Sequence, residues 1–166
     1  LPGETPTMSD WADHLTTAFP EARIKKFMEM RGADGGPWRR LCALPAFWVG
    51  LMYDQTALDG AWDLVKNWTA EQREALRVAA SVDGLQAKVD GINMHDIARE
   101  AVALSHQGLA ARARSGAGGM VPDETHFLNA LHESIESGKT PADELLDRYH
   151  GDWNGDITRV FEDYSY

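Results

Sequence analysis

Apolar residues recur at helical spacing along most of the chain after residue 37, and this pattern predicts a largely helical protein. Nearly every residue from 41 to 54 is apolar, which is typical of a buried helix, and Pro45 should kink this helix or divide it in two. Further helices are expected after Thr56, over residues 69–81, from Asp90 or Asn93 to about Arg114, over residues 124–137, and over residues 140–151.

Local signals mark where several of these helices begin. Ser9 is a suitable N-cap for a short helix near the start of the chain. Thr69 and Gln72 have the spacing of a capping box, and Thr140 followed by Pro141 predicts another helix start. The intervening stretches, residues 83–91 and the glycine-rich residues 115–119, are expected to be loops, the second a surface loop or a disordered hairpin.

Residues 23–34 show a different pattern and would form an extended strand, in which successive side chains lie on opposite faces. One face would carry Glu29 and Arg31, two residues apart. The other would carry Ile24, Met28 and Met30 and could pack against a core. We therefore expect the carboxylate and the guanidinium to point in the same direction.

Two interpretations of Glu29 and Arg31 remain open at this stage. The two residues can form a surface ion pair, which is a common arrangement. Alternatively they form a site for a metal-bound phosphate, in which Glu29 is a ligand of Mg²⁺ and Arg31 binds a phosphoryl group.

The segment Trp38-Arg39-Arg40 opens the helix that follows this strand. Two adjacent arginines just beyond a phosphate-binding strand would suit a substrate pocket. A solvated helix start, or ion pairs with the acidic remainder of the chain, explains them equally well.

Composition restricts the class of protein. The length of 166 residues fits one domain, and a hydrophobic content of 43% is enough for a core. The formal net charge of −10 disfavours nucleic acid as a partner, and no apolar run is long enough to span a membrane. The single cysteine, Cys42, excludes an intrachain disulfide, so we expect a soluble protein in a reducing compartment, the cytoplasm.

Five blocks spread over the chain form a longer pattern than any single motif. They are residues 11–21 (WADHLTTAFPE), 27–34 (FMEMRGAD), 36–54 (GPWRRLCALPAFWVGLMYD), 140–151 (TPADELLDRYHG) and 160–166 (VFEDYSY). Together they resemble the C-terminal part of glutamate–cysteine ligase of the plant and proteobacterial type. The Glu29-Met30-Arg31 segment is similar to the Glu-any-Arg strand of the wider carboxylate–amine ligase group.

This resemblance implies an enzyme of glutathione biosynthesis. ATP would phosphorylate the γ-carboxylate of glutamate, and the amine of cysteine would then attack the glutamyl phosphate. Glu29 would be a Mg²⁺ ligand, and Arg31 would contact the phosphate of the nucleotide or of the glutamyl phosphate and so act in both nucleotide binding and catalysis. Trp38, Arg39 and Arg40 are weaker candidates for the pocket.

The implied fold is α+β. Residues 1–36 would supply a helix and one or two strands of the antiparallel active-site sheet of a glutamine synthetase-like carboxylate–amine ligase fold, and residues 37–166 would form a helical region. Members of the family are much longer, so the resemblance implies that an N-terminal part supplies further metal ligands and much of the pocket, and that this piece alone is inactive. Without that part, the strand would be an exposed edge. We therefore expect a homodimer by strand exchange, aggregation, or the presence of the N-terminal part.

Two other functions remain open. The chain could be a non-catalytic helical module that binds a partner, or a sister carboxylate–amine ligase with a different amine acceptor.

Overall fold

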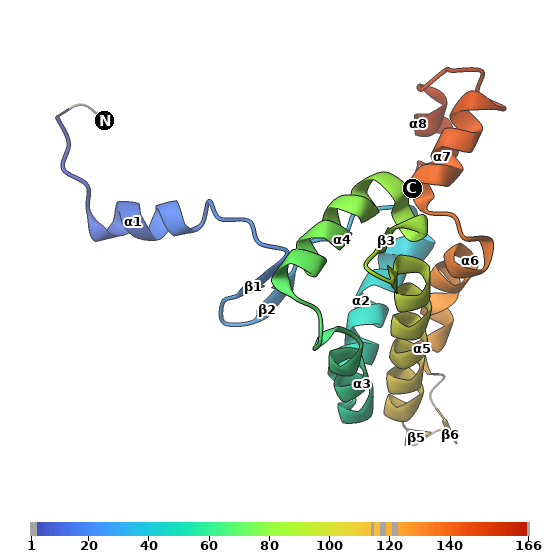
Figure 1. Cartoon of the computed structure of the whole chain (residues 1–166), viewed down its shortest axis with the longest axis horizontal. Helices are drawn as coiled ribbons and strands as arrows, with labels where there is room; N and C mark the ends of the chain where they lie inside the picture. The colour runs from blue at the N-terminus through green and yellow to red at the C-terminus, as the bar shows by residue number, and fades with distance from the viewer. Residues whose placement is uncertain (1–2, 114, 117–118, 121–122, 166) are drawn as a thin grey trace. The chain divides into compact units, whose positions relative to one another are not determined.

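The computed structural model describes residues 3–113, 115–116, 119–120 and 123–165. They belong to two compact units, Leu1–Gly35 and Gly36–Tyr166. The first unit contains helix α1 (Met8–Leu15) and the strands β1 (Ala22–Ile24) and β2 (Met28–Met30). Figure 1 labels most of these elements and those of the second unit.

The second unit is mainly helical (Figure 1). Its helices are α2 (Trp38–Met52), α3 (Gln55–Val65), α4 (Ala70–Asp83), α5 (Met94–Arg112), α6 (Asn129–Ser137), α7 (Pro141–His150) and α8 (Arg159–Asp163), with the 3₁₀ helices η1 (Gly84–Gln86) and η2 (Glu124–Leu128). Two short antiparallel hairpins join them, β3 (Lys88–Val89) with β4 (Ile92–Asn93) and β5 (Ser115–Gly116) with β6 (Gly119–Met120).

The predicted single strand over residues 23–34 is wrong in one respect, because a turn at residues 25–27 divides it into β1 and β2. The backbone N–H of Lys25 donates to the carbonyl of Phe27 at 2.8 Å and closes this turn. The expected packing of its apolar face is also absent from the described residues, since Ile24 and Met28 are both exposed. Ile24 and Met28 of the hairpin are therefore exposed, and Met30 is half-buried.

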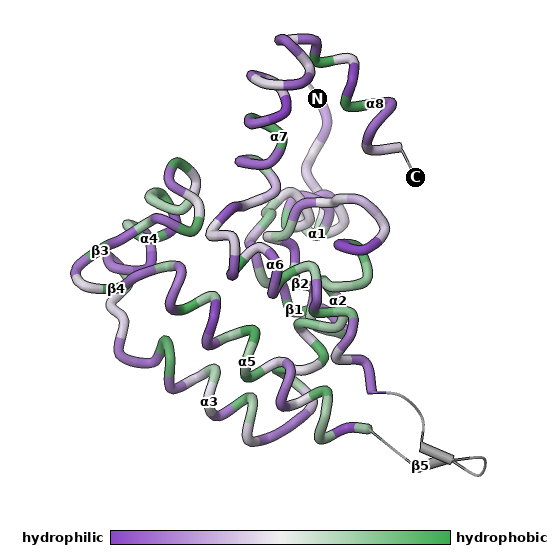
Figure 2. Tube along the Cα trace, turned by 90° about the vertical axis from the view of Figure 1, so that its right-hand side faces the viewer, coloured by the Kyte–Doolittle hydropathy of each residue, from purple (hydrophilic) through white to green (hydrophobic). Residues whose placement is uncertain are grey.

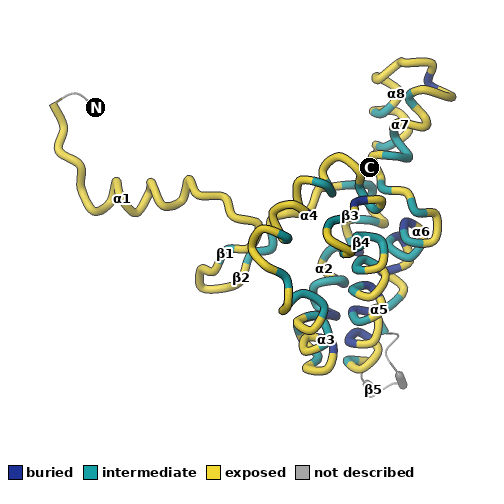
Figure 3. The backbone as a smooth tube through the Cα atoms, viewed as in Figure 1, coloured by how far each residue is buried: buried dark blue, intermediate teal, exposed yellow. Residues whose placement is uncertain are grey.

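Helix α1 begins at a different cap from the one predicted. Thr7, not Ser9, is the N-cap, and its side chain and that of Asp10 form a capping box. Asp10 reaches back to the N–H of Thr7 at 2.7 Å, whereas a cap at Ser9 would place no such acceptor at the third helical position. No residue of α1 is buried, and Figure 3 shows the helix exposed along its length.

The core of the second unit lies where α2 packs against α5, α3 and η2. Hydrophobic residues dominate the trace of α2 in Figure 2, while hydrophilic and hydrophobic residues alternate along α5. Ala46, Leu109 and Leu128 are buried together, with Phe47, Val49 and Leu131 packed around them. The predicted central helix is therefore confirmed, and it continues through Pro45 without dividing.

The remaining helix starts follow local chemistry. The capping box at Thr69 and the N-cap at Thr140 are confirmed, and Thr140 also forms a capping box with Asp143. The helix expected after Thr56 begins earlier, with Asp54 as its N-cap, because the carboxylate of Asp54 accepts from the N–H of Ala57. The segment expected as a loop over residues 83–91 holds η1 and one strand of a hairpin. Its turn places Asp90 and Gly91 at positive φ, which matches a type I′ hairpin.

Two further segments differ from the prediction. The segment expected to be one helix over residues 124–137 is the 3₁₀ helix η2 followed by α6. Within the predicted 115–119 loop, residues 115–116 pair with residues 119–120, and residues 117–118 lie outside the described residues, as does Arg114 at the predicted end of the long helix.

The described residues thus form a mostly helical protein with short antiparallel hairpins, consistent with the predicted α+β class. Of the helices within the described ranges, none combines the length and the apolar character needed to cross a bilayer.

Candidate functional site

The hairpin brings a cluster of charged side chains together around Glu29. The antiparallel register places Arg23 of β1 directly opposite Glu29 of β2. The Nε and Nη2 of Arg23 each lie 2.8 Å from Oε2 of Glu29, and Nη1 of Arg31 donates to the same oxygen at 3.2 Å. Nζ of Lys25 lies 3.8 Å from the other oxygen, Oε1. One carboxylate is therefore surrounded by three cationic side chains.

These cations favour the ionised form of Glu29. The hydrogen bond from Arg23 is the largest influence that lowers the pKa of the Glu29 carboxyl below its ordinary value, and the hydrogen bond from Arg31 adds to it. The side chain of Glu29 is 22% exposed, so solvent still reaches it. At neutral pH the site therefore contains a carboxylate that can accept hydrogen bonds or coordinate a cation.

Arg31 is only partly engaged by these contacts. Its guanidinium lies over the ring of Phe19, 4.9 Å from the ring centroid, and its backbone N–H donates to the carbonyl of Glu21 at 2.7 Å. Among the described residues, Nη1 is the one guanidinium nitrogen of Arg31 that donates a hydrogen bond. Nε and Nη2 are thus left to donate to a ligand such as a phosphoryl oxygen.

Glu29 and Arg31 lie on the same side of the hairpin, in contact with each other, as the alternation pattern predicts. Their roles toward metal and nucleotide stay predictions. Sequence reasoning missed Arg23, because a single strand over residues 23–34 has no partner strand. Reading residues 22–30 as a hairpin would have placed Arg23 opposite Glu29.

A carboxylate such as Glu29 is chemically suited to Mg²⁺, which prefers oxygen ligands. Both arginines contact Oε2, whereas Oε1 accepts no hydrogen bond from the described residues and forms a longer ion pair with Nζ of Lys25 at 3.8 Å. Within those same residues no group of three or more His, Cys, Asp or Glu side chains could hold a metal ion. Glu29 therefore fits the role of one ligand, and any others would come from outside the described residues.

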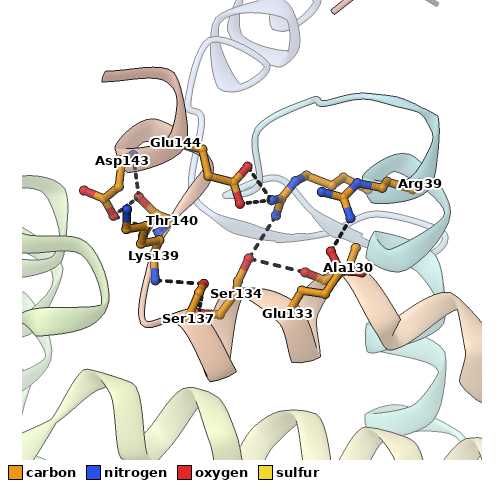
Figure 4. Close-up of polar contacts among 10 residues, drawn as sticks. Arg39, Ala130, Glu133, Ser134, Ser137, Lys139, Thr140, Asp143 and Glu144 are labelled. Atoms are coloured by element: carbon orange, nitrogen blue, oxygen red, sulfur yellow. Dashed lines mark hydrogen bonds and ion pairs between the residues drawn. The ribbon is translucent and has the colours of Figure 1, made fainter. Parts of the chain in front are cut away.

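Arg40, in the second unit, forms hydrogen bonds to Ser134 of α6 and Glu144 of α7, two residues labelled in Figure 4. Its Nη2 donates to both carboxylate oxygens of Glu144 at 3.0 Å, and its Nη1 donates to Oγ of Ser134 at 3.1 Å. The side chain of Arg40 is 11% exposed. Arg40 thus joins the start of α2 to α6 and α7, which matches the ion-pair interpretation of this residue.

Arg39 and Trp38 are more exposed than Arg40. Arg39 forms an ion pair with Glu133 of α6, seen at the right of Figure 4, and more than half of its side chain is exposed. Trp38 is also largely exposed. Both residues line a cavity of about 280 Å³ that Cys42 and Phe127 share with a neighbouring cavity of about 250 Å³. These two residues are therefore accessible to a small molecule, and their role in a substrate pocket stays a prediction.

Comparison with known proteins places the chain in a family of ligases. The model of glutamate-cysteine ligase family 2 matches residues 3–163. A chloroplastic glutamate–cysteine ligase from Nicotiana tabacum is 48% identical over 167 aligned positions, which cover 100% of this chain and 30% of the relative. The chloroplastic enzyme from Medicago truncatula is also 48% identical, over 100% of this chain and 31% of its own length. Glutamate–cysteine ligase A, chloroplastic, from Oryza sativa subsp. indica is 47% identical over 99% of this chain and 32% of its length.

The chain belongs to glutamate-cysteine ligase family 2, as the resemblance in its five sequence blocks implied. It spans about a third of the length of these relatives. The names of the relatives contradict the predicted cytoplasmic location, because all three are chloroplastic enzymes. The prediction failed because a single cysteine points only to reducing conditions, which do not distinguish one reducing compartment from another.

Proposed function

We propose that this chain is part of an ATP-dependent ligase that joins the γ-carboxylate of glutamate to the amine of cysteine. The observation that carries the proposal is the match to glutamate–cysteine ligases over essentially the whole chain. The charged cluster of the hairpin adds chemical support, since it presents a guanidinium with unused donors beside an ionised carboxylate.

The proposed reaction has two steps. An oxygen of the glutamate γ-carboxylate attacks the γ-phosphorus of ATP, and ADP leaves. The cysteine amine then attacks the carbonyl carbon of the glutamyl phosphate, phosphate leaves, and the nitrogen loses a proton. Both steps develop negative charge on phosphoryl oxygens, which fixed cationic donors stabilise.

Arg31 is proposed to meet that charge. Its Nε and Nη2 can donate to two phosphoryl oxygens, while Nη1 stays on Glu29 and the Phe19 ring supports the guanidinium plane. A guanidinium held in this way needs little rearrangement as charge develops. Arg31 would therefore both bind the nucleotide phosphate and stabilise the transferring group.

Glu29 is proposed to hold Mg²⁺ through Oε1. When bound, Mg²⁺ would neutralise charge on the phosphates of ATP. The carboxylate of Glu29 is ionised at neutral pH, since its pKa lies below the ordinary value of 4.5. The other ligands would come from the part of the enzyme that this chain does not include.

The hairpin is proposed to extend the antiparallel active-site sheet of a carboxylate–amine ligase fold. The exposed side chains of Ile24 and Met28 support this proposal, because large apolar residues on a two-stranded hairpin need cover. We propose that the remaining part of the enzyme provides that cover and completes the pocket. Exchange of this hairpin between two copies, giving a homodimer, stays a prediction.

An activity assay tests the proposal. The chain alone and the longest natural polypeptide that carries it are each supplied with Mg²⁺, ATP, glutamate and cysteine, and ADP and γ-glutamylcysteine are measured. We expect the longer polypeptide to form both products in equal amounts and the chain alone to form neither. A different amine in place of cysteine tests for a sister ligase. Absence of ATP-dependent peptide formation by the longer polypeptide would contradict the proposal.

A further inference from the structure

Neither the sequence nor the family match assigns a role to Arg23 or Lys25 of the charged cluster, and Arg23 is the more enclosed of the two, with 18% of its side chain exposed compared with 46% for Lys25. Arg23 stands on β1 opposite Glu29, and its side chain is 18% exposed, compared with 22% for Glu29 and 30% for Arg31. Arg23 is therefore the most enclosed of these three side chains. Its position is that of a residue that orients Glu29 and Arg31.

All three guanidinium nitrogens of Arg23 already have partners. Nε and Nη2 lie 2.8 Å from Oε2 of Glu29, and Nη1 donates to the carbonyl of Ala18 at 3.4 Å. Arg31 differs, because among the described residues its Nη1 alone is engaged. A planar guanidinium whose three nitrogens all lie against groups of its own chain has less capacity to bind a substrate phosphate than one with a single engaged nitrogen. Arg31 can thus donate more hydrogen bonds to a ligand than Arg23 can.

The contact with Ala18 links Arg23 to Arg31 by a second route. Ala18 precedes Phe19, and the ring of Phe19 lies under the guanidinium of Arg31. Arg23 therefore fixes the carboxylate that accepts from Arg31 and also the chain segment that carries the ring beneath it. Loss of Arg23 would loosen both supports of Arg31 together.

We propose that Arg23 is a positioning residue, which fixes Oε2 of Glu29 and the Ala18–Phe19 segment so that Oε1 of Glu29 and the unused donors of Arg31 face the ligands. The proposal rests on the proposed function, because it takes Glu29 and Arg31 as the groups that act. It adds that the fork geometry of Arg23, and not only its charge, is required. Outer partners that orient a metal ligand typically change metal affinity or activity by about 10- to 100-fold when they are removed.

Two variants separate geometry from charge. Arg23→Met removes both, whereas Arg23→Lys keeps the positive charge but has one nitrogen in place of the planar fork. Both are made in the longest natural polypeptide that carries the chain. Mn²⁺ binding without substrates is measured by electron paramagnetic resonance, kcat and KM for ATP are measured with Mg²⁺, and thermal unfolding is followed in parallel. Arg99→Met is the matched control, because Arg99 forms an exposed ion pair with Asp96 on α5.

We expect both Arg23 variants to bind Mn²⁺ about 10-fold more weakly and to lower kcat by about 10-fold or more. Their Tm should stay close to that of the native enzyme, and Arg99→Met should match the native enzyme in every measurement. Native Mn²⁺ binding and kcat in Arg23→Lys would show that charge alone suffices and would overturn the proposal. A general loss of folding in both variants would assign Arg23 to structure alone and would also overturn it.

Glu29→Gln separates failure of this inference from failure of the proposed function. If Glu29→Gln keeps native Mn²⁺ binding and turnover, the role proposed for Glu29 is wrong, and the positioning role falls with it. If Glu29→Gln loses both while Arg23→Lys keeps both, the proposed function stands and only the role of Arg23 fails.

Discussion

The carbonyl oxygen of Gly50 in α2 occupies the place where the Cβ of any other residue at position 108 in α5 would stand. In the opposite direction, a Cβ at position 50 would meet the backbone oxygen and the hydroxyl of Ser105. Ser105 in turn donates to the carbonyl of Phe47 at 2.9 Å. The crossing of α2 and α5, the centre of the helical unit, therefore depends on two glycines.

This crossing predicts that Gly108→Ala destabilises the protein. The added methyl group would collide with the backbone of α2, which a rotamer change cannot relieve, so the free energy of unfolding should fall by about 1–3 kcal/mol or more. Urea denaturation followed by circular dichroism measures the change. Gly35→Ala is the control, because a Cβ there meets no atom within 4 Å, and it should change stability by less than about 0.5 kcal/mol. Equal free energies of unfolding for Gly108→Ala and Gly35→Ala would contradict the close approach of α5 to α2 at Gly108.

The two adjacent arginines at the start of α2 give a second prediction, that the more buried ion pair contributes more to the free energy of unfolding. Arg40 is 11% exposed and bonded to Glu144 and Ser134, while Arg39 is 53% exposed and paired with Glu133. Arg40→Met should lower the free energy of unfolding by about 2–4 kcal/mol, because it leaves the Glu144 carboxylate without its partner. Arg39→Met should cost no more than about 1 kcal/mol. Chemical denaturation of both variants measures the two free energies of unfolding. Similar decreases in Arg40→Met and Arg39→Met would show that burial does not determine how much these ion pairs contribute to stability.

The charged cluster predicts an unusual titration of Glu29. Its pKa is held below the ordinary value, first by the hydrogen bond from Arg23, so the folded hairpin binds the proton less tightly than the unfolded chain. The contribution of Glu29 to stability is therefore fully present above the unfolded pKa, and it is lost as the pH falls through the lowered folded pKa. An NMR titration of the side-chain carboxyl carbon should give a midpoint below 4.5, the ordinary value. In Arg23→Met the midpoint should rise, and an unchanged midpoint would show that the pair does not form in solution.

The proposed chemistry predicts large losses of activity from two substitutions in the hairpin. In the longest natural polypeptide, Glu29→Gln removes the anionic oxygen offered to Mg²⁺, and Arg31→Ala removes the donors offered to the phosphoryl group. Each should lower kcat by about 100-fold or more, as loss of one such donor commonly does. Steady-state ligase kinetics measure the effect, and circular dichroism checks that the fold is kept. Near-native turnover in either variant would refute the role assigned to that residue.

The parts of this structure that sequence analysis predicted depend on short-range chemistry. The capping box at Thr69 involves side chains three residues apart, and the helix start at Thr140 is marked by the proline that follows it, so local spacing alone reveals both. The Asp90-Gly91 turn has an equally local signal, since Asp-Gly is typical of a two-residue hairpin, and this signal contradicts the predicted loop over residues 83–91. Local signals thus determine most helix starts in this chain.

Only part of the charged cluster can be predicted from the sequence, namely that Glu29 and Arg31 lie on one side, and the reason is physical. Alternation along an extended segment places Glu29 and Arg31 on one side, but it says nothing of the opposite strand that supplies Arg23. The turn at residues 25–27 reads Lys-Lys-Phe and contains no glycine, proline or asparagine to mark it. The partners of Arg40 were also out of reach, since Ser134 and Glu144 lie 94 and 104 residues away.

Those separations have a consequence for how the protein is made. A ribosome synthesises Arg40 long before Ser134 and Glu144, so the nascent chain carries this cation without its final partners until α7 has emerged. The contacts that join the beginning of α2 to α6 and α7 can therefore form only after at least 94 further residues have been synthesised.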